Sequence, residues 1–113
     1  MPQGKSPRRG EIWWVNLDPT VGSEINKTRP CLVIGASVVN EHRRTVVVIP
    51  LSSSPQEAPP LLVKVTCGGK PAMAVIDQVR AVAKERLTNL MDRCSAKDLG
   101  SVEAALREVL ELD

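Results

Sequence analysis

Hydrophobic residues gather in four or five short stretches separated by polar segments, and this pattern predicts a set of β-strands. The stretches cover residues 11–17, 30–36, 45–51, 61–66 and 73–82. Several of them are continuous runs rich in β-branched residues, which is typical of strands that are buried on both faces. Their spacing favours a compact antiparallel barrel over alternating βαβ units.

The C-terminal segment changes to a helical period. Ser95 and Asp98 resemble a capping box in which Asp replaces the usual Glu. Apolar residues then recur at helical spacing at Leu99, Val102, Leu106 and Val109. We expect one amphipathic helix that closes the barrel, with its apolar side in the core rather than on a partner surface.

The polar segments between the predicted strands indicate where flexible or functional loops lie. Residues 18–29, DPTVGSEINKTR, carry no apolar period, and a loop of this length in a small domain is usually functional or disordered. Residues 52–60 and 67–72 are shorter breaks of the same kind. Residues 1–9 have the composition of a disordered arm, so a single domain over residues 10–113 is expected.

Composition limits what the core and a binding surface can contain. The chain has two Trp and no Phe or Tyr, so Val, Leu, Ile and Ala must build the core, and an aromatic platform for nucleobases is disfavoured. Trp13 and Trp14 are adjacent and face opposite sides of a strand, which predicts one in the core and the other at a groove or interface. The net charge is +2, with basic residues concentrated in the first half, where a polyanion is expected to bind.

Cysteine and histidine usage argues against a metal site and for a reducing compartment. Three widely spaced cysteines without a secretory signal favour the cytoplasm, and no long apolar run predicts a membrane segment. Cys31, inside an apolar run, is interpreted as a small buried hydrophobe. His42 lies in a charged turn and is interpreted as solvated rather than as a general base. No cofactor or metal is predicted.

Polar residues at strand ends are the remaining candidates for chemistry. The chain has no nucleophile elbow and no phosphate-binding glycine loop. Structural explanations also exist: Arg29 as an exposed ion-pair partner, the serines as turn formers, and Asp77 as a partner of Arg80. The candidates are Glu24 and Arg29 in and after the long loop, Ser52 to Ser54 after the most apolar strand, and Asp77, Gln78 and Arg80 within another.

Three ordered motifs resemble those of the MazF/PemK/Kid toxins of type II toxin–antitoxin systems. They are RGEIWWVNLDPTVGSEINKTRPCLVI over residues 9–34, VVVIPLSSS over residues 46–54 and AVIDQVRAV over residues 74–82. The resemblance extends over nearly the whole chain after residue 9. The resemblance implies a mainly β fold, an SH3-like or Kid/CcdB-type antiparallel barrel with a C-terminal helix, assembled as a two-fold homodimer.

The resemblance also implies an endoribonuclease that cuts single-stranded RNA at short sequence motifs without a metal. The ribose 2′-hydroxyl attacks, leaving a 2′,3′-cyclic phosphate and a 5′-hydroxyl. The implied catalytic residues are Arg29, which clamps the scissile phosphate, Ser52, which donates a hydrogen bond to it, and Glu24 or Asp77, which carry protons. Val75 departs from the Arg that some members place two residues before the Asp, which moves more of the work to Arg29.

The resemblance also leads us to expect RNA-binding loops and an antitoxin partner, and it leaves two rival functions open. Loop residues 21–28 and 55–60 are expected to read bases. A cognate antitoxin is expected to cover the RNA groove with an acidic segment. The substrate is mRNA, with tRNA or rRNA as alternatives. The rivals are a gyrase poison of the CcdB kind, which lacks the paired Arg and Ser/Thr, and an inactive binding barrel. The predicted RNA-binding residues are Lys27, Thr28, Ser53, Gln78 and Arg80.

Overall fold

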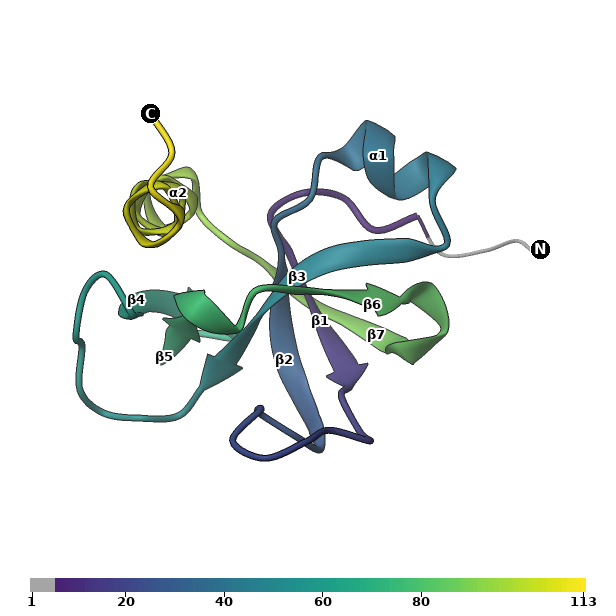
Figure 1. Ribbon diagram of the computed structural model, residues 1–113, viewed down its shortest axis with the longest axis horizontal. Helices are drawn as coiled ribbons and strands as arrows, with labels where there is room; N and C mark the ends of the chain where they lie inside the picture. The colour runs from purple at the N-terminus through teal and green to yellow at the C-terminus, as the bar shows by residue number, and fades with distance from the viewer. Residues whose placement is uncertain (1–5) are drawn as a thin grey trace.

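A computed structural model describes residues 6–113, which form a strongly curled antiparallel sheet and a long C-terminal helix (Figure 1). The helices are α1 (Ser37–His42) and α2 (Ala96–Leu110), and the short 3₁₀ turns are η1 (Ile76–Gln78) and η2 (Lys84–Arg86). The strands are β1 (Glu11–Asn16), β2 (Thr28–Val33), β3 (Thr45–Ser52), β4 (Leu62–Cys67), β5 (Lys70–Val75), β6 (Arg80–Ala83) and β7 (Leu87–Arg93).

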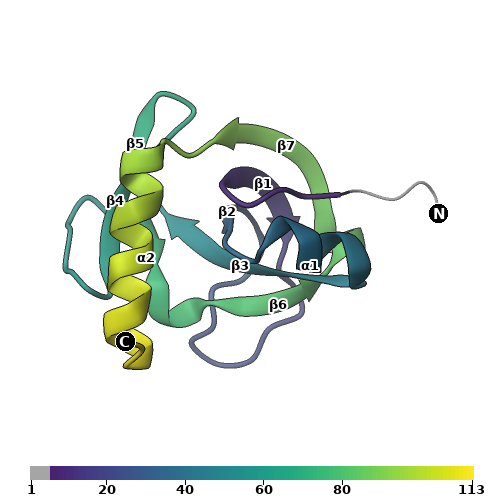
Figure 2. The same ribbon diagram turned by 90° about the horizontal axis from the view of Figure 1, so that it is seen from above.

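The strand order is β4-β5-β3-β2-β1-β7, and β6 pairs with β3 outside this path. The long strand β3 joins the two parts of the sheet, because its first half pairs with β6 and its last two residues pair with β5. All named pairings are antiparallel. The view from above shows the sheet curling round with α2 across one side (Figure 2). This confirms the predicted mainly β fold with a C-terminal helix.

The curled sheet buries apolar side chains on both of its faces. The helix-side core lies between the sheet and α2, and Ile49, Leu51, Val63, Ala74 and Val102 belong to it. The barrel core lies inside the curl and contains Val15, Leu17, Cys31, Val33, Val46, Val48, Val82 and Leu87. Burial of β-branched and aliphatic side chains on both faces explains why the strands read as continuous apolar runs.

Helix α2 begins at the cap that the sequence predicts. The Ser95 side chain accepts a hydrogen bond from the Asp98 amide, which satisfies one free N–H of the first turn. Val102 is fully buried, and Leu99, Leu106 and Val109 pack against the helix-side core. The apolar side of the helix is therefore core, as predicted.

Three elements differ from the sequence prediction. The predicted strand 73–82 is two strands, because η1 interrupts it at Ile76–Gln78. Helix α1 and strand β7 were not predicted. Strand β7 pairs only with β1, and Leu87 is its one buried residue, so an edge strand of this kind leaves little apolar pattern.

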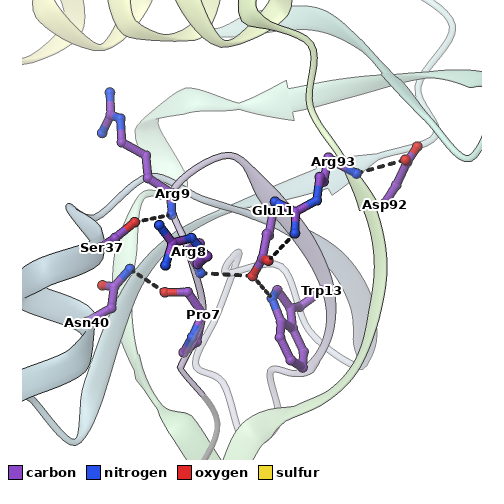
Figure 3. A network of polar contacts seen from close by, with 9 residues as sticks. All are labelled: Pro7, Arg8, Arg9, Glu11, Trp13, Ser37, Asn40, Asp92 and Arg93. Atoms are coloured by element: carbon purple, nitrogen blue, oxygen red, sulfur yellow. Dashed lines mark hydrogen bonds and ion pairs between the residues drawn. The ribbon is translucent and has the colours of Figure 1, made fainter.

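The prediction of a disordered arm over residues 1–9 is wrong for residues 7–9, and residues 1–5 lie outside the described part. The buried amide of Asn40 donates to the Pro7 carbonyl at 3.0 Å. The Arg9 amide donates to Ser37 Oγ, and its side chain contacts the Ile34 carbonyl and a carboxylate on α2. The N-terminal segment is thus held between α1 and the sheet (Figure 3).

Candidate active site

Arg29 and Ser52 lie just beyond the same end of the β2–β3 pairing. The register of this pair ends at Cys31 and Pro50, so Arg29 is two residues before the paired segment on β2 and Ser52 is two residues after it on β3. Side chains alternate between the two faces of a strand. Leu51 faces the helix-side core and Cys31 faces the barrel core, so Arg29 and Ser52 are both on the face turned away from α2. The two residues predicted to bind the scissile phosphate therefore share one face at one end of this strand pair.

The polar groups of this pair are only partly used within the protein. Arg29 Nε donates to the Asn26 carbonyl at 3.0 Å, the one hydrogen bond that the Arg29 side chain makes among residues 6–113. Ser52 is half-buried, and its Oγ accepts from the Ser54 amide at 3.2 Å. The two Nη groups of Arg29 and the hydroxyl proton of Ser52 are donors suited to the oxygens of one phosphate.

Cys31 is fully buried next to this pair and is not a nucleophile. Burial raises the pKa of its thiol from 9.0 to about 12, although the charges of Arg80 and Arg29 act in the opposite direction. A neutral thiol is unreactive, because the thiolate is the nucleophilic form. The interpretation of Cys31 as a small buried hydrophobe is confirmed, and both guanidinium groups lie close enough to influence it.

Gln78 and Arg80 hold the long loop between β1 and β2. Arg80 Nη2 donates to the Ile25 carbonyl at 2.8 Å, and Gln78 Oε1 accepts from the Ile25 amide at 3.2 Å. Ile25 also packs against the barrel core. The Arg80 Nε atom is buried without a hydrogen-bond partner within the described residues. Sequence reasoning missed Ile25 as an anchor, because its main-chain atoms make these bonds.

Glu24 also contacts Arg80, one of the residues that hold the long loop. Its Oε2 lies 4.0 Å from Arg80 Nη1, and its Oε1 accepts from the Val21 amide at 2.6 Å. The alternative that Asp77 pairs with Arg80 is wrong, because Glu24 occupies that role. Asp77 is exposed on η1, which contacts α2 and β3. The structure therefore groups Glu24 with Arg80, and leaves Asp77 on a separate turn.

Lys27, Thr28 and Ser53 are exposed around the Arg29–Ser52 pair. Lys27 adopts a left-handed conformation with φ of 67°, and its amide donates to Asp18 Oδ1 at 3.0 Å. Thr28 opens β2 opposite Asn16 of β1. Ser53 follows directly after β3 and lines a hollow there. These side chains border the pair on both sides.

The remaining aromatic and histidine predictions can be placed as well. Trp13 packs against the barrel core, whereas Trp14 is 36% exposed, as expected for two adjacent strand residues. His42 is exposed at the end of α1, and its Nδ1 lies 2.8 Å from the Val38 carbonyl. His42 therefore belongs to α1 and not to the candidate site.

Within residues 6–113, no group of three or more His, Cys, Asp or Glu side chains is arranged to hold a metal ion. No helix in the same part of the chain is long and apolar enough to cross a membrane.

Fold comparison places the protein in the class of small curled β-barrels typified by MazF. A crystal structure of MazF from Deinococcus radiodurans superposes with a TM-score of 0.84 at 23% identity, over 95% of this chain and 98% of that one. An endoribonuclease from a mycobacterial species, solved in complex with its cognate antitoxin, gives a TM-score of 0.79 at 18% identity, over 95% and 97%.

Sequence comparison then identifies the family. The model of the PemK-like, MazF-like toxins of type II toxin–antitoxin systems matches residues 8–110. Endoribonuclease MazF9 of Mycobacterium tuberculosis is 36% identical over 93% of this chain and 97% of its own length. The chain belongs to this PemK-like, MazF-like toxin family, as the three sequence motifs predicted.

Proposed function

We propose that this chain is an endoribonuclease toxin that cleaves single-stranded RNA by internal attack of a ribose 2′-hydroxyl, without a metal. The observation that supports the proposal is that Arg29 and Ser52 lie at the same end of the β2–β3 pairing, which ends at Cys31 and Pro50. The name of its mycobacterial relative, an endoribonuclease, supports the activity. The products are a 2′,3′-cyclic phosphate and a 5′-hydroxyl.

Arg29 and Ser52 stabilise the charge that develops on the phosphate. Attack by the 2′-oxygen produces a phosphorane with added negative charge, which fixed donors stabilise more strongly than they stabilise the starting diester. The planar guanidinium of Arg29 binds two phosphate oxygens at once. Ser52 donates a third hydrogen bond, and Ser53 lies next along the chain to assist.

A carboxylate accepts the 2′-hydroxyl proton as the P–O bond forms, and the 5′-oxygen takes up a proton as it leaves. We assign the acceptor to Glu24, because its carboxylate lies beside Arg80 in the loop that leads to Arg29. Asp77 is the second candidate, since it is exposed on η1 next to Gln78, which bonds the same loop.

RNA and an antitoxin are the partners of this surface. Lys27 and Thr28 directly precede Arg29 at the start of β2, and loop residues 21–28 and 55–60 read the bases of the splayed strand. Arg80 and Gln78 contribute to RNA binding by holding the loop. A mycobacterial endoribonuclease of the same fold is known in complex with its cognate antitoxin, which supports a comparable partner here.

The proposal also covers the oligomeric state of the protein and the compartment in which it acts. The active protein is a homodimer that acts on mRNA in the cytoplasm, where its free cysteines stay reduced. The family match and the endoribonuclease relatives favour this function over a gyrase poison of the CcdB kind.

The test is cleavage of a short RNA that contains one target site, in the presence of EDTA. Cutting that leaves cyclic phosphate ends supports the proposal, and a single 2′-deoxy nucleotide at the attacking position should abolish it. Cleavage of that 2′-deoxy substrate contradicts internal attack, and loss of activity in EDTA contradicts metal independence. Intact RNA together with trapped gyrase would support the rival instead.

A further inference from the structure

A hollow of about 390 Å³ begins one residue beyond Ser52, beside the loop of residues 55–60 that the proposed function assigns to base reading. Ser53, Ser54 and Pro55 line it from the segment after β3, and Pro71 lines it from β5. Its charged lining residues are Glu57 and Lys64. The volume is at the low end of the range for small-molecule pockets. We call it the base pocket.

The base pocket lies on the same face of the sheet as Arg29 and Ser52. Ser52 pairs with Met73 of β5, and Met73 pairs with Lys64 of β4. Neighbouring strands lie about 4.8 Å apart, so the Cα atom of Lys64 is roughly 10 Å from that of Ser52. The residues that come directly before or after these three along β3, β5 and β4 point to the other face and belong to the helix-side core. RNA that crosses Arg29 and Ser52 can therefore continue over β5 to Lys64 without changing face.

The lining of the base pocket suits a planar heterocycle. The Met73 side chain is almost fully buried, and the rings of Pro55 and Pro71 add apolar surface. These groups supply the contact area that aromatic side chains provide in other RNA-binding proteins. Glu57 and Lys64 both border the pocket, and neither takes part in an ion pair among residues 6–113.

We propose that the base pocket binds a guanine of the RNA beside the scissile phosphate; this inference rests on the proposed function. Guanine presents two adjacent donors, N1–H and N2–H, which a carboxylate such as that of Glu57 accepts in parallel. Its O6 accepts from the Lys64 ammonium, which only donates. Adenine, cytosine and uracil place an acceptor next to their donor, which repels a carboxylate. The pocket therefore selects guanine at one fixed position from the cut.

The experiment maps cleavage sites of the wild-type protein on a randomised RNA pool and repeats the mapping with Glu57→Gln and Lys64→Met. The matched control is Glu85→Gln, a change at an exposed carboxylate on η2. Wild-type and control proteins should cut sites that share guanine at one fixed offset. Glu57→Gln should lower the preference for guanine there by roughly ten- to hundredfold, the range for one lost two-point base contact, and leave other positions unchanged.

A substrate with inosine at that offset gives a direct test of the Glu57 contact, because inosine lacks the 2-amino group. The wild-type protein should prefer guanine to inosine, and Glu57→Gln should not. Cleavage without any fixed guanine, or an unchanged guanine preference in Glu57→Gln, overturns the inference alone. Two measurements separate the two proposals: binding of RNA that carries a 2′-deoxy block, and cleavage of the same RNA without the block. Guanine-dependent binding of the blocked RNA together with no cleavage of the unblocked RNA overturns the cleavage chemistry, and RNA that is neither bound nor cut overturns both.

Discussion

Arg29 is a charged side chain whose neighbours leave most of its donors unused. Its Nε holds the carbonyl of Asn26, which fixes the base of the guanidinium, and the adjacent Pro30 fixes the backbone at the start of β2. Ser52 lies at the same end of the β2–β3 pairing, two residues beyond Pro50. An oriented guanidinium needs little rearrangement when charge develops on a phosphate, which is the condition for effective electrostatic catalysis.

Substitution of Arg29 should separate catalysis from folding. We expect Arg29→Ala to lower the cleavage rate by on the order of a hundredfold or more, the scale for one lost transition-state donor. Arg29→Lys should also lose much of the rate, because it keeps the charge but not the two-point contact. Ser52→Ala should cost less, because it removes a neutral donor. Initial rates on a single-site RNA, with thermal melts of each variant, make the test; near-normal cleavage by folded Arg29→Ala contradicts the assignment.

The buried Cys31 thiol makes stability depend on alkaline pH. Its pKa is about 12 in the folded protein and 9.0 when solvated. Above pH 9 the unfolded chain loses this proton and the folded protein keeps it, so stability falls as pH rises toward 12. The slope is up to about 1.4 kcal/mol per pH unit.

Cys31→Val should remove this component, because Val fills a similar volume and does not titrate. Urea unfolding of both proteins between pH 8 and pH 10.5 measures the difference. Parallel losses of stability in the two proteins would show that the thiol does not contribute.

At the scale of elements, Glu11 connects the N-terminal segment, β1 and β7 (Figure 3). Its carboxylate is 4% exposed and accepts from the Arg8 amide at 2.8 Å and from Trp13 Nε1 at 3.0 Å. Arg93 Nη2 of β7 lies 3.2 Å from the same carboxylate. Each donor comes from a different stretch of backbone, so one buried charge fixes their relative positions.

Glu11→Gln should destabilise the fold by about 1–3 kcal/mol, because the amide keeps the shape but cannot accept from all three donors. Glu103→Gln is the matched control, since Glu103 pairs with Arg9 in a far more exposed position and should cost about 1 kcal/mol or less. Urea unfolding of the three proteins gives the comparison. Equal losses for the two variants would mean that Glu11 is no more important than a surface carboxylate.

The elements that sequence predicted well are those whose burial leaves a pattern. Strands β1 and β3 and helix α2 carry continuous apolar runs or a cap with helical spacing. Strand β7 is mostly exposed and pairs on one side, and the N-terminal segment attaches through main-chain groups, so neither has a side-chain signature. The turn η1 was missed because Ile76 continues the apolar run of β5.

The candidate site was predicted in part for the same reason. Arg29 and Ser52 flank apolar strands and match ordered motifs, and both come to the same end of the strand pair once β2 and β3 align. The exchange of partners, in which Arg80 faces Glu24 instead of Asp77, depends on how the long loop folds back. Loop conformation depends on distant contacts such as those of Ile25, which no local pattern reveals.

At the scale of the molecule, we expect a homodimer. A chain of this length buries a limited core. It also exposes apolar side chains at Trp14, Leu90, Met91, Leu110 and Leu112. Light scattering at micromolar concentration should give twice the 12.3 kDa mass of one chain, in a symmetric assembly. A monomer with full cleavage activity would contradict this expectation.

The attachment of the long loop at Ile25 also has a thermodynamic consequence. Both main-chain polar atoms of Ile25 are bonded to side chains beyond β5, and its own side chain packs into the barrel core. A loop anchored in this way has already lost part of its conformational entropy during folding, and the proposed function makes it the loop that reads RNA. Little of the interaction energy with RNA is then consumed in ordering the protein, so affinity depends chiefly on the contacts themselves and on the disorder that the RNA gives up.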